Sequence, residues 1–273
     1  MSDERNYYNI DDLESLGVER QGVKIPLGVA PDGVVAYFDF KENPHLLVAG
    51  NSGAGKSQLI HTMIRSLVLQ NSSEALNLIL IDPKKMGLKY YENQKIPHIL
   101  LPVVMGHGWY GAILKWNVLE IKSRIELFME KNIKNIDEYN TQEADFPLPR
   151  IIIFIDEYAQ VLEDSPSEIE RYLTRIAKFG GTFGIHLVLA TTHPLEAVYS
   201  REIKDQINAR ISLKVNSEKD SILIINQPGA ENLLGTGDML FKSVKAAKAS
   251  RLQGFSITDD QISGLHELVK EDS

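Results

Sequence analysis

Residues 45–57 have the sequence HLLVAGNSGAGKS. Its first five residues form a short, continuous apolar run, which predicts a buried strand. The remainder, GNSGAGKS, fits the pattern G-x-x-x-x-G-K-[ST]. The stretch SQLIHTMIRSLVLQ, residues 57–70, then places apolar side chains at helical spacing. A strand, a glycine-rich loop and a helix in this order predict a loop that binds the phosphates of a nucleotide.

Each residue type in this loop has a physical task. Glycines allow backbone conformations in which N–H groups surround phosphate oxygens, and the positive end of the following helix faces the anion. Lys56 is expected to reach the terminal phosphates of ATP, and Ser57 to offer its hydroxyl to Mg²⁺. The residues expected to bind the nucleotide are Gly50, Asn51, Ser52, Gly53, Ala54, Gly55, Lys56, Ser57 and Gln58.

A second apolar strand is predicted in RIIIFIDEYA, residues 150–159, and it ends in two acids. Carboxylates at the end of a buried strand are costly unless they have a partner. We expect Asp156 to hold Mg²⁺ through water and Glu157 to orient and activate the attacking water. The alternative is an exposed acidic turn. An acid directly after the metal-binding aspartate favours ATP hydrolysis over a GTPase switch, and no N-K-x-D guanine motif occurs.

Strands and helices alternate along most of the chain, which predicts an α/β fold with a mainly parallel sheet flanked by helices. A short N-terminal β-hairpin is predicted in KIPLGVAPDGVVAYFDF, residues 24–40, because two apolar segments flank the turn signal PDG. We expect an N-terminal arm at 1–26, an ATPase domain at 27–257 and a C-terminal helix at 258–273.

Composition limits the classes of protein. The chain has 273 residues, no cysteine and a formal net charge of −8. The lack of cysteine excludes a disulfide framework and a cysteine-ligated zinc site, and fits a reducing compartment. Neither a signal peptide nor a bilayer-length apolar run is present, so we expect a cytoplasmic protein without direct membrane insertion. A membrane-bound partner protein would have to bring it to a membrane.

Six stretches together resemble the FtsK/SpoIIIE family of hexameric motor ATPases. They are LGVAPDGVVAYFDFKENPHLLVAGNSGAGKS, LILIDPKK, IIIFIDEYA, GIHLVLATTHP, INARISLKV and GAENLLGTGDMLF. Their order and spacing are similar to those of the family's motor domain over most of the chain. The resemblance implies a RecA-like P-loop NTPase core that assembles as a ring of six. It also implies ATP between subunits and double-stranded DNA, bound without sequence preference, in the central pore.

The resemblance assigns further residues. Lys56, Asp156 and Glu157 keep the roles given above. Residues 82–84 match the family's DPK motif, and Gly235, Gly237 and Asp238 match its GxGDML motif near the subunit interface. Arg210 matches an arginine before the fifth strand of the core, and Thr192 follows the fourth strand. The implied catalytic set is Glu157, Lys56, Asp156, Thr192 and Arg210.

The sequence departs from the family pattern at two places. The family usually has ATQRP after the fourth strand, where this chain has ATTHP, so Thr192 and His193 replace glutamine and arginine. Thr192 can still donate a hydrogen bond to a water or to the γ-phosphate, with a shorter reach. Gly181 occupies the position of an arginine that completes the neighbouring subunit's site. Arg175, Lys178 or Arg210 would have to substitute for it.

Three functions are compatible with these residues. From the resemblance we expect a small stand-alone member without transmembrane or winged-helix parts, as is typical of mobile elements such as plasmids, conjugative elements and phages. We therefore expect an ATP-driven DNA translocase. The first alternative is an ATPase of the same fold that powers protein export, and the second is a non-hydrolysing ATP-binding assembly factor. Lys242, Lys245, Lys248 and Arg251 either contact DNA phosphates or belong to a solvated hairpin turn.

Overall fold

The computed structural model describes residues 7–13, 15–17, 22–192 and 201–271. Within this part of the chain, nine strands form a single sheet in the order β2-β1-β9-β8-β7-β3-β6-β5-β4. The strands are β1 (Lys24–Val29), β2 (Val35–Asp39), β3 (His45–Ala49), β4 (Leu76–Ile81), β5 (Arg150–Ile155), β6 (Ile185–Thr191), β7 (Ala209–Leu213), β8 (Asp238–Lys242) and β9 (Ser250–Gly254).

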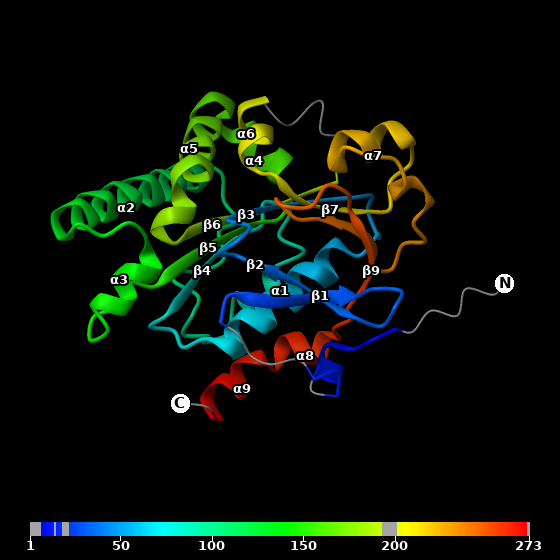
Figure 1. Ribbon diagram of the computed structural model, residues 1–273, viewed down its shortest axis with the longest axis horizontal. Helices are drawn as coiled ribbons and strands as arrows, with labels where there is room; N and C mark the ends of the chain where they lie inside the picture. The colour runs from blue at the N-terminus through cyan, green and yellow to red at the C-terminus, as the bar shows by residue number, and fades with distance from the viewer. Residues whose placement is uncertain (1–6, 14, 18–21, 193–200, 272–273) are drawn as a thin grey trace.

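The sheet has a parallel part and an antiparallel part. Strands β7, β3, β6, β5 and β4 run parallel to their neighbours. Strands β8, β9, β1 and β2 continue the sheet with antiparallel pairing. The predicted hairpin is confirmed as β1–β2, and its pairing with β9 makes it the edge of the main sheet rather than a separate element (Figure 1).

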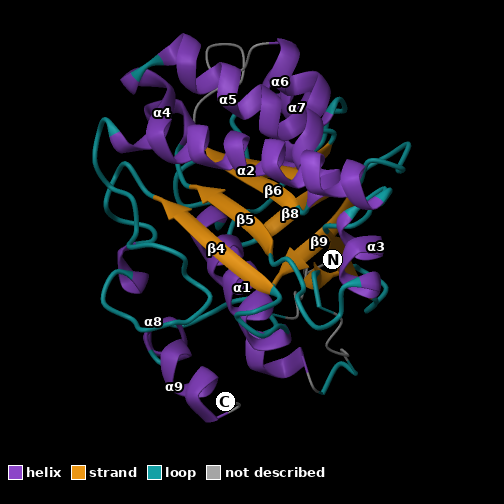
Figure 2. Ribbon diagram, turned by 90° about the vertical axis from the view of Figure 1, so that its left-hand side faces the viewer, coloured by secondary structure: helices purple, strands orange, loops and turns teal. Residues whose placement is uncertain are grey.

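Helices cover both faces of the sheet, which confirms the predicted α/β fold. Helices α2, α4, α5, α6 and α7 lie over one face, and α1, α8 and α9 lie over the other (Figure 2). The helices are α1 (Lys56–Gln70), α2 (Trp109–Lys131), α3 (Ile136–Gln142), α4 (Tyr158–Asp164), α5 (Pro166–Phe179), α6 (Arg201–Gln206), α7 (Glu218–Ile225), α8 (Asp259–Ser263) and α9 (Leu265–Glu271). Among the residues described, none of these helices is long and apolar enough to cross a bilayer.

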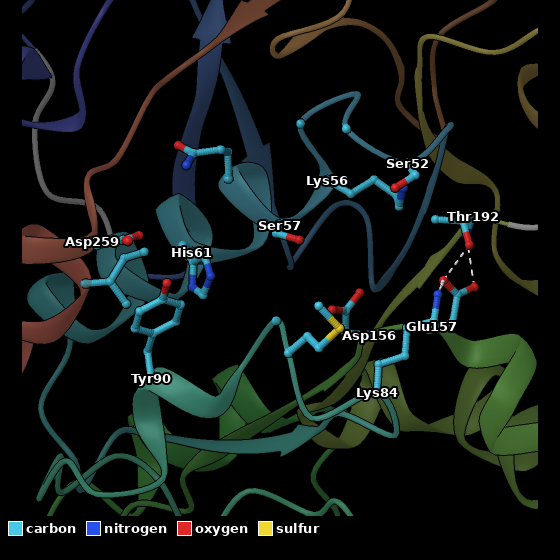
Figure 3. A pocket seen from close by; sticks show the side chains of 16 residues that line it. Ser52, Lys56, Ser57, His61, Lys84, Tyr90, Asp156, Glu157, Thr192 and Asp259 are labelled. Atoms are coloured by element: carbon cyan, nitrogen blue, oxygen red, sulfur yellow. Dashed lines mark hydrogen bonds and ion pairs between the residues drawn. The ribbon is translucent and has the colours of Figure 1, made fainter.

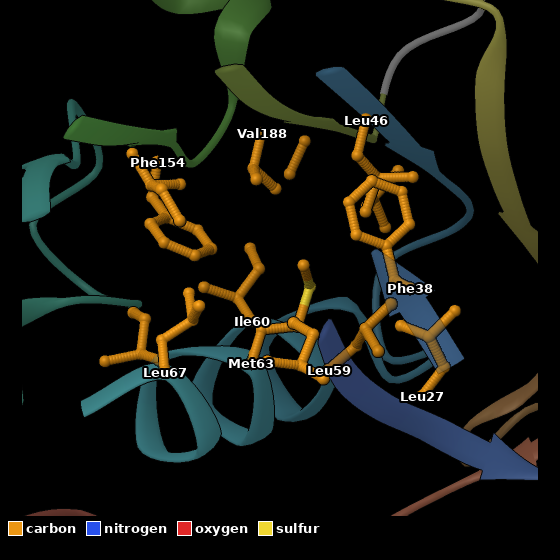
Figure 4. Close-up of a cluster of buried hydrophobic side chains, with 14 of the residues drawn as sticks. Leu27, Phe38, Leu46, Leu59, Ile60, Met63, Leu67, Phe154 and Val188 are labelled. Carbon is orange, nitrogen blue, oxygen red and sulfur yellow. The ribbon is translucent and has the colours of Figure 1, made fainter. Parts of the chain in front are cut away.

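The central strands are apolar on both sides because each side packs against helices. In β5, Ile152 and Phe154 join the core under α1, whereas Ile151, Ile153 and Ile155 join the core under α2 and α5. Figure 4 shows the first of these cores, in which α1 packs against the sheet and the hairpin. The two cores fix the carboxyl ends of β3 and β5, which carry the predicted functional residues.

Both chain ends differ from the expected division. Strand β1 crosses the expected boundary between residues 26 and 27, so the end of the arm belongs to the sheet. The arm is also held by the C-terminal region, because Ile10 N donates to Ser256 O at 2.9 Å. The expected C-terminal helix is two helices, α8 and α9, separated at Gly264. Helices α3 and α4 were not predicted, because both are short and lack a full apolar stripe.

Candidate nucleotide-binding site

A pocket of about 540 Å³ opens where β3 and β5 end. Ligand pockets in proteins typically have volumes of about 300–1,000 Å³. Of the residues predicted to bind the nucleotide, those that line the pocket are Ser52, Gly53, Gly55, Lys56, Ser57 and Gln58. Asp156, Glu157 and Thr192 line it as well, so the fold brings the two predicted acids to the phosphate loop (Figure 3).

The phosphate loop is braced from behind by the segment that contains the GxGDML motif. Gly237 N donates to Ala54 O at 3.1 Å. Gly55 has φ of 112°, and a Cβ on it would lie 2.7 Å from Gly237 N, so only glycine fits there without rearrangement. Asp238 fixes this segment, because it accepts both Nε and Nη2 of Arg251, at 2.9 and 2.7 Å. The shape of the phosphate loop therefore depends on Gly237, Asp238 and Arg251, which lie far from it in the sequence.

Lys56 is held in the loop by backbone carbonyls. Its Nζ donates to Gly50 O at 2.7 Å and to Asn51 O at 2.9 Å, and the residue is 7% exposed. Burial lowers the pKa of Lys56 to about 8, although the carboxylates of Glu157 and Asp156 oppose this shift. The Lys56 ammonium is still charged at neutral pH. Because burial has removed water from it, a bound anion would stabilise its charge.

Glu157 sits on a sharp turn between β5 and α4. Its φ and ψ are 59° and 60°, in the left-handed region that residues other than glycine, asparagine and aspartate rarely adopt. Such backbone conformations often occur at functional sites, where the surrounding structure maintains them. Here Glu157 lines the pocket with its side chain next to Thr192 (Figure 3).

Three residues hold the Glu157 carboxylate. Lys84 Nζ donates to Oε2 at 2.7 Å, and Thr191 Oγ1 donates to Oε1 at 3.0 Å. Thr192 donates twice, from its backbone N at 3.0 Å and from its hydroxyl. Burial raises the pKa of Glu157, but the hydrogen bonds from Lys84 and Thr192 outweigh it and hold the pKa at about 2. The carboxylate is therefore ionised but too weakly basic to take a proton readily in this arrangement.

Thr192 orients Glu157 in two ways, and only one of them depends on its side chain. We expect Thr192→Val to lower kcat for ATP about tenfold or more with little change in KM, because one hydrogen bond to the ionised carboxylate is lost. Thr192→Ser keeps the hydroxyl and is expected to retain near-normal kcat. Steady-state phosphate release measures both variants. Equal kcat for the valine and serine variants would show that the hydroxyl has no positioning role.

The environment of Asp156 is unfavourable for a lone carboxylate. Burial, together with the carboxylates of Asp82 and Glu157, raises its pKa to about 6, although Lys56 and Lys84 oppose this shift. Asp82 is fully buried, and its Oδ2 accepts Leu88 N at 2.8 Å. A cation bound at Asp156 would reduce the repulsion between its carboxylate and those of Asp82 and Glu157. The charge on Asp156 is lost as the pH falls through about 6.

The structure corrects the assignment of Arg210. The residue is 4% exposed, and its guanidinium donates to Ile207 O at 3.2 Å, Ile224 O at 3.2 Å and Lys204 O at 2.9 Å. These bonds join α6, β7 and α7 within one subunit. A buried guanidinium satisfied by backbone carbonyls stabilises the fold, so Arg210 is neither a catalytic residue of this pocket nor an exposed substitute for the missing arginine.

The structure also gives a reason for glycine at position 181. A Cβ on Gly181 would lie 2.5 Å from Pro44 Cβ, so even alanine requires a shift of this neighbour. Arg175 and Lys178, on α5, have exposed side chains. They remain candidates for the role that the arginine would have. His193, noted as a departure from the family pattern, lies outside the described residues.

From the sequence, Lys84 is a residue of the DPK motif that either touches phosphate or is a solvated surface lysine, and its bond to Glu157 was not predicted. The C-terminal residues Asp259 and Ile262, which line the pocket, were not predicted either. The signal for Lys84 was its place directly after a buried strand, next to the strand that carries Asp156 and Glu157. No local signal marks Asp259 or Ile262, because their position depends on how the chain end packs.

Comparison with known proteins identifies the family. The FtsK/SpoIIIE family model matches residues 12–233. DNA translocase FtsK of Caldanaerobacter subterraneus is 38% identical over 250 residues, which cover 91% of this chain and 35% of that protein. DNA translocase FtsK of Clostridium acetobutylicum is 37% identical over 264 residues, which cover 95% of this chain and 34% of that protein. The chain thus spans about a third of the length of these relatives.

Solved structures show the same fold. The pCW3 conjugation coupling protein TcpA, in a monomer form with ATPγS, superposes with a TM-score of 0.83 at 25% identity and covers 98% of this chain and 74% of its own. The type VII secretion ATPase EccC of Thermomonospora curvata has a TM-score of 0.75 at 22% identity over 92% of this chain and 31% of its own. With its phosphate loop and paired acids in one pocket, the chain belongs to the FtsK/SpoIIIE family of P-loop ATPases.

Proposed function

We propose that the protein is an ATP-driven translocase of double-stranded DNA that works as a ring of subunits. The observation that carries this proposal is a single pocket in which the phosphate loop faces Asp156 and Glu157. Relatives that are DNA translocases support the choice of DNA as the substrate. In this proposal Lys56 neutralises charge on the phosphates, and Glu157 takes a proton from the attacking water.

The donors around Asp156 fit Mg²⁺. Among the described residues, no group of three or more histidine, cysteine, aspartate or glutamate side chains forms a closed metal site. Mg²⁺ in nucleotide sites usually binds one or two protein oxygens, several waters and the phosphates themselves. Ser57 and Asp156 supply such oxygens, and burial together with the nearby carboxylates of Asp82 and Glu157 raises the pKa of Asp156, which a bound cation would lower. When bound, Mg²⁺ would neutralise charge that develops on the transferred phosphoryl group.

The ion pair between Lys84 and Glu157 sets a condition for catalysis. As long as Lys84 Nζ lies 2.7 Å from Glu157 Oε2, the carboxylate is a weak base. A terminal phosphate in the pocket is a competing anion for the same ammonium, because the Lys84 side chain is 36% exposed and lines the pocket. We propose that bound nucleotide draws Lys84 away from Glu157, so that the base becomes active only when the substrate is present.

We propose that the subunits assemble into a ring, because the family suggests it and because α5 carries exposed cations that can act on a neighbouring subunit. Pro44 lies against the position where the family has the arginine, which supports the proposal that a cation from another position completes the neighbouring subunit's site. Arg175 and Lys178 supply exposed cations on α5. A fivefold or larger loss of turnover in Arg175→Ala or Lys178→Ala, rescued by mixing with Glu157→Gln subunits, would identify the residue that acts across the interface.

The likeness to a conjugation coupling protein supports a role in plasmid transfer or in another mobile element. DNA as the substrate is tested by the fluorescence anisotropy of a labelled linear duplex, measured with a non-hydrolysable ATP analogue at low and at physiological salt. A DNA motor is expected to bind with a steep loss of affinity as salt increases, because phosphate contacts release counterions. Lack of duplex binding under all these conditions would reject DNA as the substrate and favour the export ATPase.

A further inference from the structure

Asp82 is a buried acid that the proposed hydrolysis does not use. It directly follows β4, and the parallel pairing of β4 with β5 places Ile81 beside Ile155. The next residue of each strand is an aspartate, Asp82 or Asp156, so two carboxylates follow neighbouring strands at the same edge of the sheet. Asp156 lines the nucleotide pocket, whereas Asp82 is fully buried. Any role of Asp82 therefore has to act through the wall of the pocket.

The Asp82 carboxylate is only partly satisfied. Its Oδ2 accepts Leu88 N at 2.8 Å, and within the described part of the chain its Oδ1 accepts no hydrogen bond. Buried charges in proteins are usually paired or lie at a metal ion, because an isolated buried charge is costly. The neighbouring acid, Asp156, adds to this cost. A cation bound at Asp156 would therefore be favoured by both carboxylates.

Asp82 also fixes the loop that follows it, residues 83–88. Lys85 N donates to Asp82 O at 3.2 Å, and Leu88 N donates to Oδ2 of the same aspartate. Lys85 has φ of 57°, in the left-handed region, and Leu88 is buried in the core. The loop is thus turned back on itself and anchored at its far end. Its position depends on the side chain of Asp82.

Gly87, in this loop, lies against the carboxylate of Asp156. A Cβ on Gly87 would lie 2.2 Å from Asp156 Oδ2 and 3.9 Å from Asp82 Oδ2. One point beside the loop is thus close to both carboxylates, and the absence of a side chain leaves room for Asp156. Gly87 does not have a positive φ, so space rather than backbone conformation accounts for glycine here. Gly87 also lines the pocket, so the loop forms the wall at this point.

The charge of Asp82 acts on a cation through this wall. Attraction between opposite charges is stronger in a buried region than in water, because less solvent screens it. A carboxylate close behind Asp156 would raise the affinity of a divalent cation there by about tenfold or more. The cation would not have to touch Asp82 for this effect.

We propose that Asp82 is a positioning residue of the Mg²⁺ site. Its charge strengthens cation binding at Asp156, and its bond to Leu88 N holds Gly87 against the Asp156 carboxylate. Asp82 acts from behind the wall rather than as a ligand, because it is fully buried. The inference rests on the proposed function, because it needs a nucleotide and Mg²⁺ in this pocket. It gives the aspartate of the DPK motif a role in cation binding.

Calorimetric titration with ATPγS, in Mg²⁺ buffer and in EDTA, tests this role. Asp82→Asn keeps an oxygen that can accept Leu88 N, but it removes the charge. In Mg²⁺ buffer this variant is expected to bind ATPγS about tenfold more weakly than wild type. In EDTA it is expected to bind at least as tightly as wild type, because a carboxylate that repels the phosphates is gone. General damage to the fold would weaken binding in both buffers.

Gly87→Ala tests the geometry of the site without removing a charge. The new Cβ would meet Asp156 Oδ2, so the Asp156 side chain has to move. We expect about tenfold weaker binding of ATPγS in Mg²⁺ buffer and near wild-type affinity in EDTA. Gly111→Ala on α2 is the matched control, because its Cβ would meet no atom closer than 4.0 Å. This control is expected to have wild-type affinity in both buffers.

The control for the charge is Asp164→Asn. Asp164 Oδ2 also accepts a backbone amide, Gly108 N at 2.9 Å, but Asp164 lies outside the lining of the pocket. Wild-type affinity is expected in both buffers. The EPR signal of free Mn²⁺, with protein in excess over ATPγS, measures cation affinity directly. A Kd for Mn²⁺ about tenfold higher than in wild type is expected for Asp82→Asn but not for Asp164→Asn. Thermal melting checks the fold of each variant.

The possible results separate the inference from the proposed function. Equal losses of ATPγS affinity in Mg²⁺ buffer and in EDTA would show that Asp82 only supports the fold, and would overturn the inference. Wild-type affinity for Mn²⁺ in a folded Asp82→Asn protein would overturn it as well. Failure of wild-type protein to bind ATPγS in either buffer would instead contradict the proposed function.

Discussion

Replacing Glu157 with glutamine is expected to abolish ATP turnover while ATP still binds. Glutamine has the size of glutamate and can still accept hydrogen bonds from Thr191 and Thr192, so the geometry of the turn is kept. It cannot take a proton from water. General base catalysis contributes about 10²–10⁴-fold to a rate, and a loss of this size is expected in kcat. Phosphate release measures turnover, and calorimetry measures ATP binding.

The matched control for this variant is Glu163→Gln. Glu163 is an exposed residue of α4, the helix that begins directly after Glu157. The same chemical change there is expected to leave kcat and ATP affinity unaltered. Substantial turnover in Glu157→Gln would show that another group activates the water, and loss of ATP binding would show that Glu157 has a structural role instead.

Replacing Lys56 with alanine is expected to remove nucleotide binding. In the structure Lys56 Nζ is held by Gly50 O and Asn51 O, in the loop that would surround the phosphates. Hydrogen bonds to charged groups contribute about 1.5–3 kcal/mol each. Two such bonds to phosphate oxygens correspond to a loss of affinity of about a hundredfold or more. Titration with ATP and with tripolyphosphate measures this loss, which is expected for both ligands.

Lys115→Ala, which removes an exposed lysine of α2, is the control for a general change of charge. Thermal melting shows whether Lys56→Ala is folded, since the substitution leaves two backbone carbonyls without their ammonium partner. Unchanged ATP affinity in a folded Lys56→Ala protein would contradict the assignment of residues 50–57 as the phosphate loop.

The fold was predictable wherever the signal is local. The phosphate loop, the hairpin and the buried strands each follow from a short pattern of glycines, turn residues or apolar runs. Ser217 is a typical helix cap in sequence, and its hydroxyl accepts Asp220 N at 3.1 Å at the start of α7. Helices α3 and α4 escaped prediction because, at seven residues each, they are too short for helical periodicity to emerge.

In the candidate site, the residues of the phosphate loop and the two acids were predictable from the sequence, but the side chains that hold the acids were not. Asp156 and Glu157 are placed by the strand that precedes them, and parallel pairing brings that strand near the phosphate loop. Their partners are set by tertiary packing: Lys84 lies 73 residues before Glu157 in the sequence, and Thr192 lies 35 residues after it. The role of Arg210 was predicted wrongly for the same reason. Sequence position cannot distinguish an arginine that faces a neighbour from one that holds three backbone carbonyls.

Whether the protein is an ATP-driven DNA motor is tested by phosphate release from ATP, with and without linear duplex DNA, for wild-type protein beside Glu157→Gln. We expect turnover that duplex DNA stimulates strongly, that added salt suppresses, and that the glutamine variant lacks. Turnover that is indifferent to DNA would contradict a DNA motor. Bound ATP without turnover under every condition would contradict hydrolysis at Glu157 and support a non-hydrolysing assembly factor.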